Sequence, residues 1–336
     1  MSIRHAFRFR NRLMQTAILE APRRFAVQSM EPPAPGEGEI LLRVRGCGVC
    51  GSDMGPWKGI QGLSYPMPPG APGHEVFGTV EAVGPGVSGL AAGAPVTALT
   101  YRAYAEYDVA RAAEVVPLPA VLAGRTVLGE PVACAVNVAR RAGVREGDVV
   151  VLLGTGFLGA LLLQLLRAPG APRPSRVITV SRRRLSPEMA ERLGIDESLT
   201  YEEDVHGRVG MATAGRMADV VIEATGRQRP LDLGAELTRV RGRLIVAGYH
   251  QDGTRTVNMQ LWNWRGLDVI NAHERDPEIY RRGMEEGVAL LAAGGLDLAP
   301  LITHTFPLAE INRAFGMAEE RPEGFLKSVV LPEDDG

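Results

Sequence analysis

Separated segments of the sequence carry side chains that are suited to bind a metal ion. Cys50 lies 24 residues before His74, which Glu75 follows directly, and Glu130 and Cys134 lie further along the chain. A thiolate, an imidazole and a carboxylate are suitable zinc ligands, and a catalytic zinc takes three protein ligands and leaves a fourth position open. Because the candidates are far apart in sequence, the pattern favours a catalytic ion over a structural site of closely paired cysteines.

Each of these residues also has an ordinary structural explanation. A single cysteine is usually a small buried hydrophobic residue, and a single histidine is more often structural than a ligand. Cys47 and Cys50 have the CxxC spacing of a redox pair, but the thioredoxin-like βαβ context that such a pair needs is absent. The metal hypothesis therefore depends on the combination of residues.

A glycine-rich turn indicates a dinucleotide site. Gly154, Gly156 and Gly159 follow the apolar run VVVLL and precede a predicted helix, which Phe157 and Leu158 begin. The first glycine permits the tight turn, the second lets the backbone approach a pyrophosphate, and the third lets the helix pack closely on the strand. The helix N-terminus offers free N–H groups to the phosphates. An ordinary glycine-rich turn is the alternative.

The end of the following strand indicates which dinucleotide is bound. An NAD site usually has an acidic residue there to hold the ribose 2′-hydroxyl, whereas this chain has Ser181 followed by Arg182, Arg183 and a third arginine. Guanidinium groups bind a phosphate in a bidentate manner, so we predict NADP in preference to NAD. Thr225 and Gly248, which follow later strands, complete the predicted cofactor contacts.

The elements that must position these residues divide the chain in two. Up to residue 130, short apolar runs recur between Gly and Pro turns, which is typical of a β-rich barrel or sandwich. Beyond it, strands alternate with helices, as in parallel α/β folds. The predicted strands are VVVLL, RVITV, DVVIEA, RLIVAG and LDVINA, starting at residues 149, 176, 219, 243 and 267. A helix is expected around 279–293.

Composition excludes several classes of protein. The 336 residues suggest two domains. Lys and Arg number 37 against 39 Asp and Glu, which argues against a nucleic-acid partner. The uncharged stretch 149–166 is interrupted by glycines, so we expect a strand, turn and helix and no membrane span. Three cysteines and a basic, non-apolar first segment (1–13) predict a cytoplasmic protein without a disulfide framework.

The motifs together resemble a known family. GVCGSD (48–53), GHEVFGTVEAVG (73–84), GEPVACA (129–135) and GTGFLG (154–159) are similar in order and spacing to the zinc-dependent medium-chain alcohol and polyol dehydrogenases. The resemblance implies an α/β fold: a Rossmann domain with a doubly wound parallel sheet, over 132–272, and a β-rich GroES-like catalytic domain, from 1–131 and 273–336. It also implies a homodimer or homotetramer, with the strand at 267–272 a candidate for pairing between subunits.

The resemblance implies roles for single residues. Cys50 and His74 hold the catalytic zinc, and the third ligand is Glu75, Glu130 or Cys134. Asp53 orients the zinc-bound imidazole. Ser52 takes part in removing the proton of the substrate hydroxyl while a hydride passes to the nicotinamide.

Two departures from the family pattern bear on this hypothesis. No cysteines occur between residues 97 and 119, where many members bind a structural zinc, so we predict a single zinc per chain. Gly55 stands where the family often has a proton-relaying histidine, which leaves the proton route beyond Ser52 open.

The predicted activity is oxidation of a secondary alcohol, or reduction of its ketone, on a polyol, sugar or cyclitol-like molecule. Two other functions remain open from the sequence. One is a zinc-free quinone or enone reductase that uses NADPH. The other is a dinucleotide-binding protein without turnover.

Overall fold

The computed structural model describes residues 13–332 and divides the chain into two compact units. One, here called the β-rich unit, consists of the described residues of Met1–Glu130 and Ile302–Gly336; the other, the nucleotide unit, is Pro131–Leu301. The prediction of a basic extension over 1–13 lies outside the described residues, apart from Leu13.

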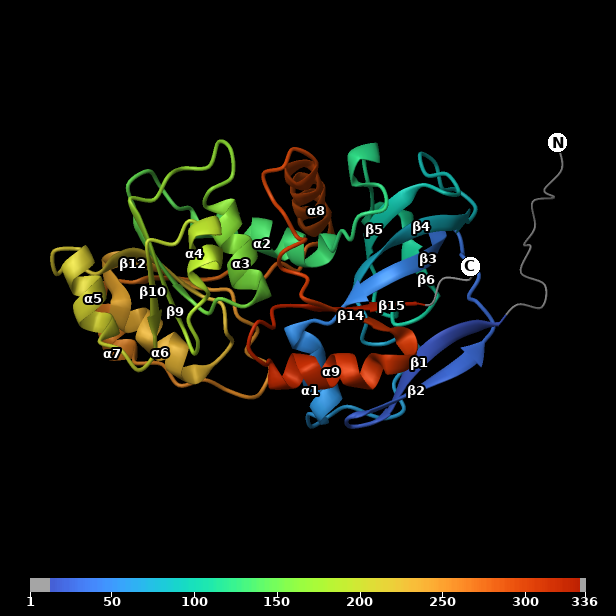
Figure 1. Cartoon of the computed structure of the whole chain (residues 1–336), viewed down its shortest axis with the longest axis horizontal. Coiled ribbons are helices and arrows are strands. Elements are labelled where there is room, and N and C mark those ends of the chain that lie inside the picture. The colour runs from blue at the N-terminus through green and yellow to red at the C-terminus, as the bar shows by residue number, and fades with distance from the viewer. Residues whose placement is uncertain (1–12, 333–336) are drawn as a thin grey trace. The chain divides into compact units, whose positions relative to one another are not determined.

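The β-rich unit is built around a sheet with the strand order β14-β15-β3-β4-β5-β7, and β6 pairs with β3 (Figure 1). A separate antiparallel hairpin joins β1 to β2. The bounds are β1 (Met14–Ala21), β2 (Arg24–Met30), β3 (Glu39–Gly48), α1 (Met54–Lys58), β4 (Glu75–Val83), β5 (Pro95–Leu99), β6 (Tyr107–Arg111), β7 (Val115–Pro117), β14 (His304–Pro307), α9 (Ile311–Glu320) and β15 (Ser328–Leu331).

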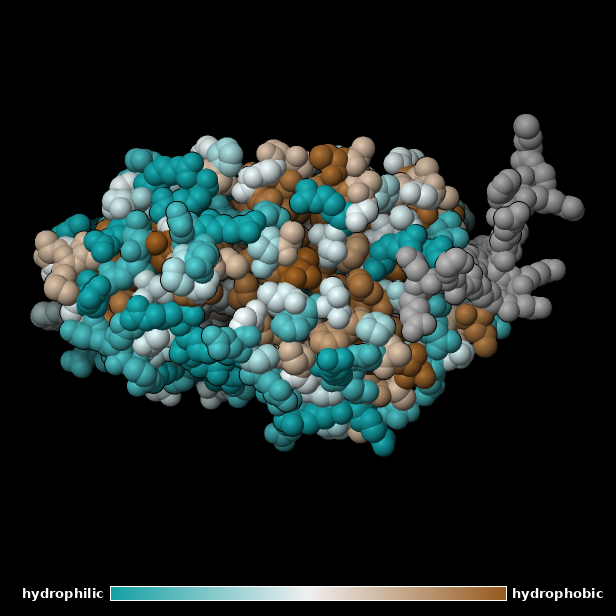
Figure 2. Space-filling model, in the orientation of Figure 1, coloured by the Kyte–Doolittle hydropathy of each residue, from teal (hydrophilic) through white to brown (hydrophobic). Residues whose placement is uncertain are grey.

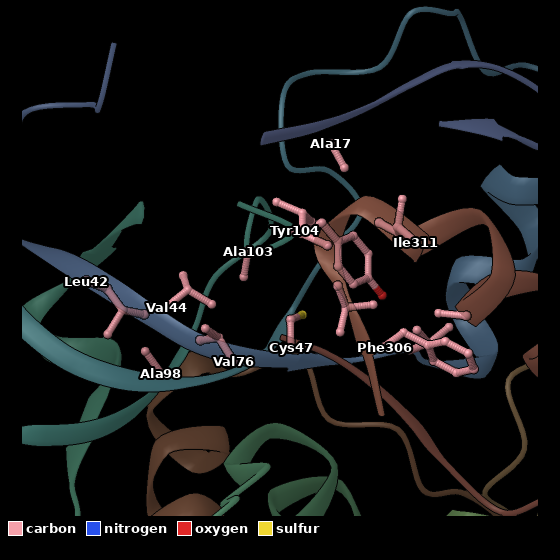
Figure 3. Close-up of a cluster of buried hydrophobic side chains, with 14 of the residues drawn as sticks. Ala17, Leu42, Val44, Cys47, Val76, Ala98, Ala103, Tyr104, Phe306 and Ile311 are labelled. Atoms are coloured by element: carbon pink, nitrogen blue, oxygen red, sulfur yellow. The ribbon is translucent and has the colours of Figure 1, made fainter. Parts of the chain in front are cut away.

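Both ends of the chain contribute to the core of this unit. Strand β15 pairs with β3 on one side and with β14 on the other. Figure 3 shows Ala17 from β1, Cys47 from β3 and Ile311 from α9 around the buried ring of Tyr104. Because apolar side chains from remote segments are buried together, neither end forms this core alone.

The nucleotide unit is a parallel sheet with helical crossovers. Its strand order is β10-β9-β8-β11-β12-β13, the order of a Rossmann sheet that reverses beside its first strand. The bounds are α2 (Gly129–Ala142), β8 (Val149–Leu153), α3 (Phe157–Leu165), β9 (Arg176–Ser181), α4 (Pro187–Arg192), β10 (Glu197–Thr200), α5 (Val205–Ala212), β11 (Ala218–Glu223), α6 (Gln228–Leu237), β12 (Thr238–Val246), α7 (Met259–Arg265), β13 (Asp268–Asn271) and α8 (Pro277–Ala292).

The sheet confirms the predicted fold class. Strand β8 is an apolar run that is buried along its whole length, as a strand covered on both faces requires. Within residues 13–332, no helix is long and apolar enough to cross a membrane, and 149–166 is strand β8, the glycine turn and helix α3. The face shown in Figure 2 mixes hydrophilic and hydrophobic side chains without a continuous apolar band.

The end of the nucleotide unit differs from the sequence expectation. We expected the catalytic part to resume at residue 273, whereas the compact unit extends to Leu301. The reason is that α8 packs against α2: a Cβ atom on Gly287 would lie 2.2 Å from the Val132 side chain. Arg140 and Glu286 add an ion pair between the same helices, with 2.6 Å between their nitrogen and oxygen.

Candidate active site

The glycine turn after β8 has the geometry of a phosphate-binding loop. Gly154 has φ +101°, a conformation that side chains rarely adopt. A Cβ atom on Gly159 would lie 2.1 Å from the carbonyl oxygen of Gly154, so only glycine lets the helix pack this closely. A Cβ atom on Gly156, the N-cap of α3, would meet no other atom within 4 Å. The turn is therefore closely packed against the protein at Gly159 and open at Gly156. A bound pyrophosphate needs such open space.

In the β-rich unit, residues after β3 and at the start of β4 form a group of metal-binding type. Cys50 lies just after β3, and His74 and Glu75 lead into β4, which pairs with β3. Their sulfur, ring nitrogen and carboxylate oxygen all lie within 4.8 Å of one another. The antiparallel pairing of Gly48 with Glu75 explains how residues so far apart in sequence meet.

The imidazole of His74 is oriented by its second nitrogen. Nδ1 lies 2.9 Å from the carbonyl oxygen of Pro72, which can only accept a hydrogen bond, so Nδ1 carries a proton. The Asp53 carboxylate lies 3.2 Å from the same nitrogen. In the neutral ring the lone pair is then on Nε2, 3.4 Å from the Ser52 hydroxyl oxygen. A carboxylate behind a histidine in this manner is typical of zinc ligands.

Asp53 is itself held by a buried network that the sequence did not predict. Its Oδ2 accepts hydrogen bonds from the Cys50 backbone N–H (2.9 Å) and from the Tyr104 hydroxyl (2.7 Å). Burial, together with the nearby Asp53 charge, raises the pKa of Tyr104 well above its usual value, which keeps the hydroxyl a donor. No motif in the sequence connects Tyr104 to the site.

The electrostatics of the group suit a cation. Burial raises the pKa of the Cys50 thiol, and the charge of Glu75 raises it further. Burial lowers the pKa of His74, but the charges of Asp53 and Cys50 outweigh this effect, so that the pKa of His74 is raised overall. A bound divalent ion supplies the positive charge that a buried thiolate otherwise lacks. The donor set and its spacing therefore fit zinc.

Glu75 has a buried cationic partner. The Lys327 ammonium, from the segment before β15, lies 2.6 Å from Oε1 of Glu75, and both side chains are almost completely buried. Burial works against the charge on Lys327, but the Glu75 carboxylate raises the pKa of Lys327 overall. Lys327 is one of two lysines in the chain and lies among apolar residues, which is the signal in the sequence that marks it as a buried cation.

The other predicted metal ligands are not part of this group. Glu130 is buried in the first turn of α2, and the group of mutually close donor atoms found in residues 13–332 does not include it. Cys134 lies in α2 of the nucleotide unit, where its sulfur is 2.7 Å from the Tyr280 hydroxyl oxygen. Among the three candidates for the third ligand, the structure brings only Glu75 to Cys50 and His74.

The predicted 2′-phosphate region lies at the carboxyl end of β9. Ser181 is buried, and its hydroxyl donates a hydrogen bond to the backbone oxygen of Arg183. Arg184 forms an ion pair with Glu203. Arg182 is exposed, and within residues 13–332 its guanidinium makes no hydrogen bond or ion pair. Arg182 is therefore the arginine with its donors available to a phosphate.

Thr225 and Gly248, the other predicted cofactor contacts, lie in the loops after β11 and β12. The N–H and hydroxyl of Thr225 bond to Glu223, the last residue of β11. A Cβ atom on Gly248 would lie 2.1 Å from the backbone nitrogen of Gly226, so the two loops touch there. No sequence motif marks Glu223 or His250, which join these loops.

Comparison with known proteins gives the site a context. A family model described as "Alcohol dehydrogenase GroES-like domain" matches residues 36–120, and one described as "Zinc-binding dehydrogenase" matches 158–289. The chain is 27% identical to a sorbitol dehydrogenase of Halalkalibacterium halodurans, over 87% of this chain and 91% of that protein. It is also 27% identical to a 2-dehydro-3-deoxy-L-galactonate 5-dehydrogenase of Pseudoalteromonas atlantica, over 88% and 92%. A mycobacterial structure solved with NADPH is 25% identical with a TM-score of 0.80, covering 95% of this chain and all (100%) of that one.

Proposed function

This chain belongs to the zinc-type medium-chain dehydrogenase/reductase family, and we propose that it transfers a hydride between NADP(H) and a secondary alcohol or ketone. The observation that carries the proposal is the mutual proximity, within 4.8 Å, of donor atoms from Cys50, His74 and Glu75. We propose these residues as the zinc ligands, and Glu75, which lies in this group, as the third ligand in place of Glu130.

The side chains around the ligands prepare the site for chemistry. A zinc ion held there supplies Lewis-acid activation of the substrate oxygen. Asp53 and Pro72 keep the proton of His74 on Nδ1, so Nε2 is available as a ligand. The Ser52 hydroxyl, on the Nε2 side of the ring, would relay the proton of the substrate alcohol, accepting it while passing its own hydroxyl proton to water. The nicotinamide carries the hydride.

NADP is supported by the end of β9. Ser181 ends β9 where an NAD site would carry an acidic residue, and Arg182 follows it. Within residues 13–332, the Arg182 guanidinium makes no hydrogen bond or ion pair. The mycobacterial relative with NADPH is in line with this choice. The proposed cofactor contacts are Gly154, Gly156, Phe157, Leu158, Gly159, Ser181, Arg182, Arg183, Thr225 and Gly248.

The relatives support a polar, polyhydroxylated substrate. Their names refer to sorbitol and to a deoxygalactonate, both of which carry secondary hydroxyl groups. We propose a polyol, sugar or cyclitol-like molecule on this basis. The sparse free cysteines suit a cytoplasmic location.

A homodimer is proposed from the edge of the nucleotide sheet. Strand β13 pairs with β12 on one side and ends the described sheet on the other. Trp264, in the helix before it, is 86% exposed. A second copy of the chain, adding its own β13 about a two-fold axis, would satisfy the edge and cover this ring.

The zinc content of protein purified without chelators tests the proposed metal centre. We expect about one zinc per chain, and loss of most of it in Cys50→Ala and His74→Ala. Glu75→Gln should lose zinc as well, whereas the control Glu130→Gln should retain it. Turnover of NADP with a polyol panel should disappear with the metal and return when zinc is restored.

Several outcomes would contradict the proposal. Turnover that continues in metal-free protein would favour the zinc-free reductase. Loss of zinc from Glu130→Gln but not from Glu75→Gln would show that the third ligand is Glu130 and not Glu75. Two zinc ions per chain would reveal a second metal site.

A further inference from the structure

The strand order assigns the two halves of a bound dinucleotide to opposite sides of β8. The glycine turn after β8 takes the pyrophosphate, and the end of β9 takes the adenosine ribose. On the other side of β8, the sheet continues through β11 to β12. The nicotinamide half must therefore extend over the loops that follow these strands, here called the β11 loop (224–227) and the β12 loop (247–256).

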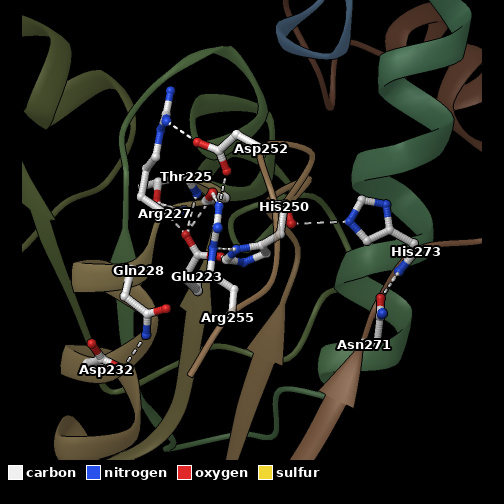
Figure 4. Close-up of polar contacts among 12 residues, drawn as sticks. Glu223, Thr225, Arg227, Gln228, Asp232, His250, Asp252, Arg255, Asn271 and His273 are labelled. Carbon is white, nitrogen blue, oxygen red and sulfur yellow. Dashed lines mark hydrogen bonds and ion pairs between the residues drawn. The ribbon is translucent and has the colours of Figure 1, made fainter. Parts of the chain in front are cut away.

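A chain of hydrogen bonds, drawn in Figure 4, joins these two loops. Glu223, completely buried at the end of β11, accepts hydrogen bonds from the backbone N–H groups of Thr225 (2.6 Å) and Gly226 (2.9 Å). Its other carboxylate oxygen lies 2.9 Å from Nε2 of His250 in the β12 loop. Arg255, five residues further on, donates from Nε to Nδ1 of His250 at 2.9 Å.

The chemistry of these groups fixes the direction of every hydrogen bond. The Arg255 guanidinium can only donate, so Nδ1 of His250 must accept. The proton of the neutral ring is then on Nε2, from which it is donated to the Glu223 carboxylate. Arg255 also donates to the carbonyl oxygen of Gly226, at 2.9 Å, and so returns to the β11 loop.

The β11 loop is also packed against the phosphate-binding turn. A Cβ atom on Gly154 would lie 2.6 Å from the methyl group of Thr225, and Ala224 donates its N–H to the Leu153 carbonyl oxygen at 2.9 Å. A shift of the β11 loop would therefore displace the turn that is proposed to bind the pyrophosphate. His273 lies beside this set of hydrogen bonds. Its Nε2 is 3.3 Å from the carbonyl oxygen of Gly248, and its ring contacts the Tyr249 ring.

We propose that Glu223, His250 and Arg255 form a positioning relay that holds the β11 and β12 loops in the arrangement that receives the nicotinamide half of the cofactor. The inference rests on the proposed function, because it needs a bound dinucleotide. It assigns His250 and Arg255 as positioning residues that act through the backbone of the two loops. Loss of the relay should weaken binding of the nicotinamide half and leave binding of the adenosine half intact.

Two probes separate these halves. NADPH reports on the whole cofactor, and adenosine 2′,5′-bisphosphate reports on the adenosine half alone. We expect His250→Ala to weaken NADPH binding on the order of tenfold and to change bisphosphate binding less than twofold. Both affinities are measured on the zinc-loaded full chain, by NADPH fluorescence titration and by calorimetry.

Companion variants test the relay against a purely structural role. Arg255→Ala, at the other end of the relay, should give the same selective loss. His250→Gln should retain NADPH affinity, because a side-chain amide both accepts from Arg255 and donates to Glu223. The matched control is Arg239→Ala. It removes a 2.6 Å ion pair with Asp219, which lies at the amino end of β11, the strand that Glu223 ends. It should lower thermal stability and leave the ratio of the two affinities unchanged.

The outcomes distinguish the relay from the proposed function. If the wild type binds NADPH, but His250→Ala and Arg255→Ala weaken both probes equally or neither, the relay alone is overturned. If the wild type binds no nicotinamide dinucleotide at all, the proposed function is overturned and the relay with it.

Discussion

At the scale of single residues, the proposed choice of NADP over NAD rests on Arg182. Among the three arginines after Ser181, Arg184 is already bound to Glu203, whereas Arg182 has no hydrogen bond or ion pair within residues 13–332. A guanidinium whose donors are available binds a phosphate strongly, because hydrogen bonds between charged groups are stronger than neutral ones.

Arg182→Ala should therefore raise the KM for NADP on the order of tenfold and leave the KM for NAD almost unchanged. Steady-state kinetics with both cofactors measure this difference, and Arg184→Ala is the control because its partner is a protein carboxylate. Equal losses with the two cofactors would show that Arg182 does not contact the 2′-phosphate.

The sequence pointed to single residues that could do chemistry more readily than to the residues that hold them in place. Cys50, His74 and Glu75 were candidates because few residue types bind zinc, and the structure brings them together. Tyr104 and Lys327, which hold Asp53 and Glu75, were not predicted, since their partners lie 51 and 252 residues away and no local pattern connects them. Trp57, which closely follows the Cys50 motif, packs in the core against Phe25 and Phe315.

At the scale of elements, the glycines of the turn between β8 and α3 serve different purposes. Gly159 is needed for packing, and Gly156 leaves space for a ligand. The hydrogen of Gly159 faces the carbonyl oxygen of Gly154, whereas that of Gly156 faces open space. The same substitution at the two positions should therefore have different consequences.

Gly159→Ala should lower the free energy of unfolding by about 1–3 kcal/mol, because its Cβ overlaps the backbone. Gly156→Ala should leave stability nearly unchanged but weaken NADPH binding, because its Cβ occupies the space beside the pyrophosphate. Chemical denaturation and NADPH titration of both variants check this contrast. A loss of stability in Gly156→Ala with unchanged affinity would contradict it.

Elements with a strong local pattern were predicted well. The five predicted strands of the nucleotide unit all occur, because buried parallel strands are often continuous apolar runs. Their ends agree within two residues, except that β12 begins at Thr238, five residues before its predicted start. The short strand β10 was not predicted. The C-terminal end of the nucleotide unit was not predicted. The sequence of α8 shows that one face of the helix is apolar, but not which element that face packs against. Its packing on α2 depends on Gly283 and Gly287, whose missing side chains let the helices approach.

At the scale of the whole molecule, the edge of the nucleotide sheet determines the expected assembly. Ala272 donates its N–H to β12, so by the alternation of strand residues the N–H of Val269 points away from the sheet. That group is available to a second copy of β13.

Val269→Pro should convert the proposed dimer to a monomer, because proline removes this donor. Trp264→Ser should weaken the dimer by removing the exposed ring, and Met211→Ser, at a 73% exposed methionine in α5, should not. Sedimentation velocity over a range of concentrations measures the assembly. A wild-type chain that is monomeric at every concentration would contradict the proposal.

The place of β15 between β3 and β14 has a consequence for the order of biosynthesis. The strands of the nucleotide unit follow one another along the chain, so this unit can fold as it leaves the ribosome. The β-rich unit must wait, because β15 and Lys327 are synthesised after the whole nucleotide unit. During that interval the Cys50 thiol and the Glu75 carboxylate are already synthesised but lack the strand and the cation that enclose them. Nascent chains therefore pass through a stage in which the proposed metal ligands are exposed to solvent, oxidants and competing ions.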